Sequence, residues 1–107
     1  MRIGGYVAFG CDCDDFDPDG APIALRRAGF DVMRMPERFR SRMEIPQDDF
    51  ILVSTDVRAG DDKVLDAIMN EINAIVDRYG GDLSECGPIP SDRVPFEDLF
   101  EWRPRLH

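Results

Sequence analysis

Hydrophobic side chains recur at steps of three and four between Asp61 and Gly81, and this spacing predicts one long amphipathic helix. Aspartates at its start can accept the free amide protons of the first turn. Gly80 and Gly81 at its end permit the left-handed turn that stops a helix. The apolar stripe consists of Leu65, Ile68, Ile72, Ile75 and Tyr79, widened by Val64, Met69 and Val76. Such a helix needs an apolar surface to lie on, and we expect neighbouring strands to provide it.

Shorter apolar runs on both sides of this helix predict strands and a second, shorter helix. The short helix is expected to begin near Pro22 and to end at Gly29. Within 39–45, hydrophobic residues alternate with charged ones, which predicts an exposed or edge strand whose arginines discourage aggregation. The other strands are expected at 2–10, 30–35, 50–57 and 83–89.

Two strand–helix–strand units in 107 residues favour an α+β fold of ferredoxin type. This is a two-layer sandwich in which two helices lie on one face of an antiparallel sheet. The length fits a single domain over residues 1–107, in which 91–107 form a C-terminal tail rich in proline and aromatic residues. The open face of the sheet needs a cover, which the tail or another chain could supply.

The net charge of −9 argues against general nucleic-acid binding, because contact with phosphates needs a basic surface. The charge is uneven, since residues 21–44 carry six arginines against three acids. Some of these arginines could meet phosphates, but pairing with neighbouring acids is the interpretation that we favour. They are Arg34, Arg38, Arg40 and Arg42.

No apolar run approaches the roughly 18 residues needed to span a bilayer, and the N-terminus lacks the apolar segment of a signal peptide. We therefore expect a cytoplasmic protein that does not contact membranes. An odd number of cysteines (Cys11, Cys13 and Cys86) disfavours a disulfide framework. The three thiols could contribute to a zinc site, but free thiols in a reducing compartment are the simpler interpretation.

The acidic loop over residues 12–19 is the candidate metal site. Asp15, Asp17 and Asp19, followed by Gly20, match the opening of a calcium-binding loop, in which carboxylates surround a hard cation. The match then fails, because Arg26 stands where a bidentate glutamate is needed. We favour a solvated loop in which Asp17 or Asp19 caps the short helix, and a module that binds calcium or a small ligand through this loop is the alternative.

Enzyme chemistry has little support in the sequence. The chain contains one histidine, His107, so no internal histidine can act as a general base near neutral pH. The glycines form no phosphate-cradling pattern. We therefore expect a protein that is not an enzyme and carries no cofactor.

The segment 50–87, FILVSTDVRAGDDKVLDAIMNEINAIVDRYGGDLSECG, resembles the closing strand–helix–strand of the regulator of ribonuclease activity B family. The shared features are an apolar strand, an acidic amphipathic helix and a Gly-Gly pair at the helix end. Gly29-Phe30-Asp31 is similar to the end of that family's first helix. The chain departs from the family at Cys86-Gly87-Pro88, in its arginine-rich middle and in its tail. The resemblance implies a ferredoxin-like protein that inhibits ribonuclease E by binding it, without catalysis.

These observations predict a non-catalytic regulatory or adaptor domain that binds a protein partner, such as a ribonuclease or another basic protein. An acidic surface, formed by the long helix and the 12–19 loop, would attract and orient the partner. Its helical members are Asp62, Asp66, Glu71 and Asp77. Aromatic residues of the tail would supply affinity, namely Phe96, Phe100 and Trp102. The same aromatic residues could instead close a homodimer or cover the sheet.

Overall fold

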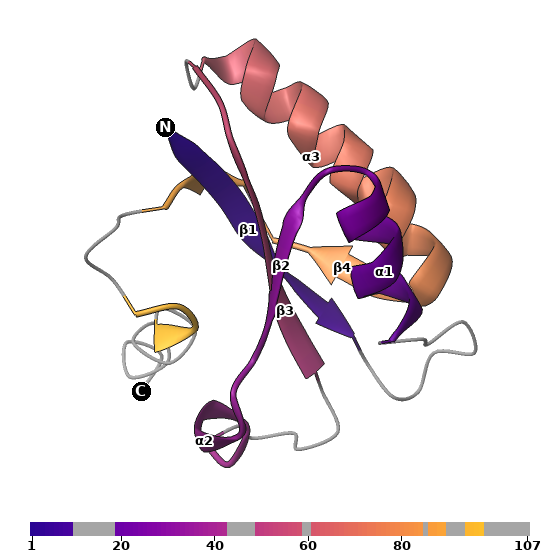
Figure 1. Ribbon diagram of the computed structural model, residues 1–107, viewed down its shortest axis with the longest axis vertical. Coiled ribbons are helices and arrows are strands. Elements are labelled where there is room, and N and C mark those ends of the chain that lie inside the picture. Colours follow the sequence, from indigo (N-terminus) through magenta and orange to yellow (C-terminus); the bar gives the residue numbers. More distant parts are fainter. Residues whose placement is uncertain (10–18, 43–48, 59–60, 85, 90–93, 98–107) are drawn as a thin grey trace, which may run out of the picture.

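The computed structural model describes residues 1–9, 19–42, 49–58, 61–84, 86–89 and 94–97. Strands and helices alternate along most of this length (Figure 1). In chain order the elements are β1 (Arg2–Phe9), α1 (Gly20–Arg27), β2 (Asp31–Arg34), α2 (Glu37–Arg40), β3 (Asp49–Asp56), α3 (Asp62–Val76), the 3-10 turn η1 (Asp77–Tyr79), β4 (Gly81–Leu83) and β5 (Gly87–Pro88).

The strands form an antiparallel sheet in the order β2-β3-β1-β4, and β5 pairs with the same edge of β1 as β4. The central pair is continuous, because β1 and β3 stay in register from Arg2 opposite Asp56 to Phe9 opposite Asp49. Helices α1 and α3 each connect two strands that are separated by a third. This is the ferredoxin-like arrangement, and it confirms the predicted α+β sandwich.

Helices α1 and α3 cover the same face of the sheet, and the main hydrophobic core lies beneath them (Figure 1). Alternate residues of β1 and β3 point into this core, as the period of two in a strand requires. The buried members are Val7, Phe9, Ala21, Leu25, Phe30, Ile51, Val53, Ile72 and Val76. The helix-side stripe predicted from the sequence supplies the last two of them.

The predicted boundaries of α3 are also confirmed. Asp61 is its N-cap, and the Oδ1 atom of this residue accepts a hydrogen bond from the Val64 amide at 2.9 Å. Gly80 ends the helical segment with a left-handed backbone, at φ 75°. Gly81 has a different role, because it lies against Phe9, Val7 and Val76 where the helix end packs on β1.

The opposite face of the sheet carries a second, smaller hydrophobic cluster. Its buried members are Met35, Phe39, Leu52 and Phe96, and Tyr6, Phe50 and Ile89 pack against them. Phe96 comes from the C-terminal tail, so the tail covers part of the face that α1 and α3 leave open. The tail is thus one of the two candidates, the tail and another chain, that the sequence offered to cover this face.

The predicted strand over 39–45 is wrong in its described part. Residues Glu37–Arg40 form the short helix α2 after Pro36, and the Ser41 amide donates to the Glu37 carbonyl at 3.2 Å. The helical turn buries Phe39 against the sheet and leaves the arginines around it near the surface. Residues 43–45 lie outside the described part of the chain.

The predicted last strand, 83–89, is divided into two short strands. Between them, the Tyr6 amide donates to the hydroxyl of Ser84 at 2.9 Å, and the Ser84 amide donates to the Tyr6 carbonyl at 2.8 Å. A side chain therefore replaces a backbone group in the ladder beside β1. The Ile89 amide then resumes backbone pairing with the Arg2 carbonyl at 3.0 Å.

Candidate functional site

The long helix presents its carboxylates on two sides. Successive residues of an α-helix are about 100° apart around the axis, so Asp62, Asp66 and Asp77 fall within about 60° of one another. We call these three residues the acidic flank. Glu71 lies at least about 120° from each of them, so it does not belong to the same surface. All four side chains are exposed.

The carboxylates of the acidic flank are not part of the described ion pairs that connect the strands and loops around the sheet. Within the described part of the chain, no lysine or arginine forms an ion pair with the flank. By contrast, Arg2 pairs with both Asp31 and Asp56 on neighbouring strands. The flank carboxylates are therefore exposed to solvent and make no described ion pair, although Lys63 and Arg78 are next to two of them in the sequence.

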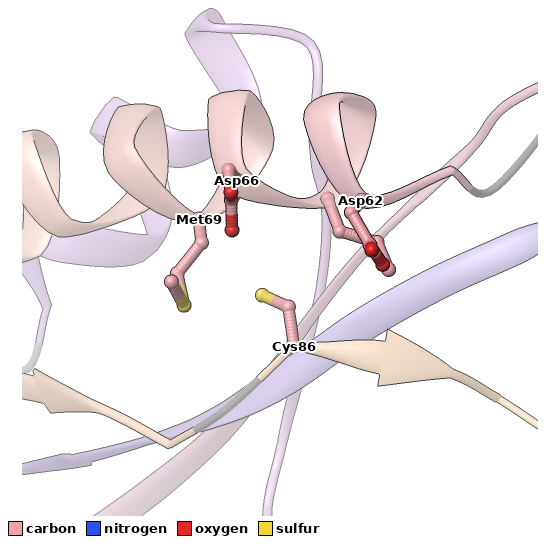
Figure 2. A pocket seen from close by; sticks show the side chains of 5 residues that line it. Asp62, Asp66, Met69 and Cys86 are labelled. Carbon is pink, nitrogen blue, oxygen red and sulfur yellow. The ribbon is translucent and has the colours of Figure 1, made fainter.

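A groove lies beside the acidic flank, between the first half of α3 and the segment that joins β4 to β5 (Figure 2). It has a volume of about 270 Å³ and is lined by Asp62, Leu65, Asp66, Met69 and Cys86. Figure 2 shows the sulfur atoms of Met69 and Cys86 turned towards the same space. The accessible lining of the groove is mainly polar, because two carboxylates lie beside Leu65, Met69 and Cys86, and its volume is below that of a typical drug-sized ligand site.

Cys86 is a free, half-buried thiol at this groove. Burial raises its pKa, because the surrounding protein disfavours the charged thiolate. The thiol is therefore protonated near neutral pH and is a weak nucleophile. In this arrangement Cys86 offers a packing surface, and the described residues contain no cluster of three or more His, Cys, Asp or Glu side chains that could hold a metal ion.

Of the calcium-loop residues, only Asp19 lies in the described part of the chain. It occupies the N-cap position of α1, but its side chain makes no capping hydrogen bond. Its Oδ1 atom instead accepts a hydrogen bond from Arg34 Nη2 at 2.9 Å. The prediction that Asp19 caps the helix is therefore wrong, because its carboxylate binds the guanidinium of Arg34 on β2. Asp15 and Asp17 lie outside the described residues, and calcium binding stays a prediction.

Sequence reasoning missed Asp49, a carboxylate with 7% exposure at the start of β3. Its oxygen atoms lie 3.7 Å from Arg34 Nη2 and 3.7 Å from Arg40 Nη1. Arg42 pairs with Glu97 at 3.8 Å, and Arg38 lies over the ring of Phe39. Arg34, Arg40 and Arg42 thus pair with neighbouring acids, as the favoured interpretation has it, whereas the described contact of Arg38 is with an aromatic ring. Only the apolar run around Asp49 could have signalled its burial.

Of the three aromatic residues proposed as anchors, one lies in the described part of the chain. Phe96 is fully buried against the sheet, so its ring covers the domain and is not exposed to a partner in this conformation. Phe100 and Trp102 lie outside the described residues.

Among the described residues, no helix has both the length and the apolar character needed to cross a membrane.

Comparisons of the chain with models of protein families, with curated proteins and with solved structures find no match.

Proposed function

We propose that this protein is a non-catalytic regulatory or adaptor domain that binds a basic segment of a protein partner along the acidic flank. The observation that carries this proposal is the grouping of three exposed aspartates on one side of α3, none of which takes part in a described ion pair. Several arginines near the sheet pair with neighbouring acids, whereas no described ion pair involves a flank aspartate. A surface of this kind attracts positive charge over a distance of about 8 Å at physiological salt.

The groove beside the flank adds a place for an apolar contact. Leu65, Met69 and Cys86 line a groove into which an aliphatic side chain could insert, while Asp62 and Asp66 lie within reach of its basic neighbours. Carboxylates set the rate and orientation of the encounter, and a desolvated apolar side chain supplies affinity. The best-fitting partner segment therefore carries lysine or arginine on both sides of one leucine, isoleucine or methionine.

A narrower form of the proposal names the partner as a ribonuclease, which the bound domain would inhibit in the cytoplasm. It is supported by the resemblance of residues 50–87 to the regulator of ribonuclease activity B family and by the ferredoxin-like fold that this resemblance implies. In this form, the domain acts by occupying the enzyme's surface and contributes no catalytic group.

Affinity capture from lysate of the source organism, followed by mass spectrometry, tests the proposal. The test variant replaces all three flank aspartates with asparagine. The control variant makes the same change in net charge elsewhere, through Glu37→Gln, Glu71→Gln and Asp82→Asn, which are exposed positions off the flank. We expect the flank variant to bind the captured partner about tenfold more weakly, since three screened charge contacts of about 0.5 kcal/mol each add to that factor.

The control variant should retain the partner at the level of the unmodified protein. If both variants lose the partner equally, net charge and not the flank is responsible, and the proposed site is wrong. If neither loses it, the partner binds another surface. Ribonuclease activity measured with and without the domain tests the narrower form separately.

A further inference from the structure

An aromatic pocket lies on the face of the sheet opposite α1 and α3. Tyr6 of β1, Phe39 of α2 and Leu52 of β3 form its walls, and Met35 lies beside them. The ring of Phe96 fills it with 0% exposure. The centroid of this ring lies 5.4 Å from that of Tyr6 and 6.3 Å from that of Phe39, both in tilted geometry. These are favourable aromatic contacts.

The segment that delivers Phe96 is attached to the sheet as a bound peptide would be. The Phe96 amide donates to the hydroxyl of Tyr6 at 2.9 Å, and Glu97 Oε1 lies 3.8 Å from Arg42 Nη1. Within the described residues, 94–97 makes no backbone–backbone hydrogen bond with a strand. Val94, two residues before the anchor, is 47% exposed. One ring, one hydrogen bond and one ion pair therefore carry the described attachment.

The backbone of Phe96 opposes this attachment. Its φ of 74° lies in the left-handed region, and Phe96 is the one described residue other than glycine with a positive φ. A phenylalanine adopts this conformation at a cost, so its surroundings must hold it there. Withdrawal of the ring from the pocket would release that strain. We call the state in which the Phe96 ring occupies the pocket the closed state. Burial of the ring favours this state, and the left-handed backbone of Phe96 disfavours it.

We infer that this pocket is a peptide-binding site that the chain's own Phe96-Glu97 occupies, and that a partner segment with an aromatic residue followed by an acidic residue competes for it. The rim of the pocket matches such a ligand in charge. The guanidinium of Arg38 lies 4.9 Å from the centroid of the Phe39 ring, and that of Arg42 lies 6.0 Å from it. This surface is on the opposite side of the sheet from α3, so it is independent of the acidic flank.

Binding of a labelled peptide to the full-length chain tests the inference. The probe is RVPFEDL, the sequence of residues 93–99, and fluorescence anisotropy measures its affinity for the unmodified protein and for Phe96→Ala. We expect Phe96→Ala to bind the probe saturably. The unmodified protein should bind it about tenfold more weakly or worse, because only its open fraction is competent. The control peptide RVPAEDL, which lacks the ring, should not bind either protein.

Failure of the folded Phe96→Ala variant to bind the probe would overturn the inference, as would equal binding of the two peptides. If Phe96→Ala does not fold, Glu97→Arg replaces it, because repulsion from Arg42 weakens the closed state while the ring is retained. If the unmodified protein forms a dimer that Phe96→Ala abolishes, the competing segment is that of a second copy, which supports the inference.

Hydrogen exchange of the unmodified protein provides an independent measurement. The Phe96 amide is protected by the Tyr6 hydroxyl, so its exchange reports withdrawal of the segment. We expect it to exchange much faster than the amides at the centre of β3, which open only with the whole domain. If the Phe96 amide exchanges as slowly as those of β3, the segment leaves the pocket only on global unfolding, and the inference is wrong.

Discussion

Gly81 lies where the end of α3 packs on β1, and the surrounding side chains leave no room for a methyl group. A Cβ atom at this position would lie 2.8 Å from Phe9 Cε1, 2.9 Å from Val7 Cγ1 and 3.0 Å from Val76 Cβ. All three neighbours are fully buried, so none can turn into solvent to make space. We therefore predict that Gly81→Ala separates the helix from the sheet at this point and destabilises the domain.

The magnitude follows from two opposing effects. Overpacking of a well-packed core costs about 1–3 kcal/mol. Loss of glycine's extra freedom in the unfolded chain offsets about 0.4–1 kcal/mol of this. The expected decrease in the free energy of unfolding is thus about 1–2 kcal/mol, and each kcal/mol lowers the Tm of a domain of this size by about 4–8 °C.

Urea denaturation followed by far-ultraviolet circular dichroism measures the effect. Gly87→Ala in β5 is the matched control, because a Cβ atom there would meet nothing within 4 Å. The control is expected to leave stability unchanged or to raise it by up to about 1 kcal/mol. If Gly81→Ala is as stable as Gly87→Ala, the helix end does not approach β1 as described, and the explanation is refuted.

Three further changes have expected outcomes that the same unfolding assay or chemical labelling can check. Asp61→Ala removes the N-cap hydrogen bond of α3 and should cost about 0.5–2 kcal/mol, whereas Asp62→Ala should cost less, about 0.3–1 kcal/mol, because it contributes only to the helix dipole. Asp49→Ala should cost about 1–3 kcal/mol, because it removes the acceptor of the Phe50 amide and a buried carboxylate close to two arginines, while the exposed Asp56→Ala should cost at most about 1 kcal/mol. Cys86 should be alkylated more slowly in the folded protein than in urea, and the pH midpoint of its alkylation rate should lie above the ordinary thiol pKa of about 8.5. Because the folded protein disfavours the thiolate, the free energy of unfolding should decrease as the pH rises above that value. Equal alkylation rates in the two states would contradict this.

The elements that the sequence predicted well are those whose signals are local. The cap at Asp61, the stripe that contains Ile72 and the stop at Gly80 all lie within the helix they define. The apolar run of β3 was similarly sufficient, because a strand with Ile51 and Val53 on one face and Leu52 on the other is buried from both sides. Local patterns of this kind, combined with chain length, favour one topology.

The prediction failed where contacts between distant residues decide the structure. The alternation around Phe39 resembles a strand, but this ring packs against Leu52 and Phe96, and a helical turn after Pro36 brings it there. No local pattern indicates that Phe96 fills a pocket on β1. The acidic flank was predicted in part, since the helix period groups three of its proposed acids and separates Glu71 from them. The groove at Cys86 could not be predicted, because the sequence does not show where the segment after β4 passes α3.

The division of the fourth strand has a consequence for how the sheet meets other sheets. Where Ser84 supplies its hydroxyl in place of a backbone group, this edge lacks the unbroken row of donors and acceptors on which another strand could add. The other edge, β2, is four residues long and carries Asp31 and Arg34 at its ends. Among the described residues, both borders of the sheet are therefore short or interrupted, which disfavours edge-to-edge pairing with a strand of another molecule.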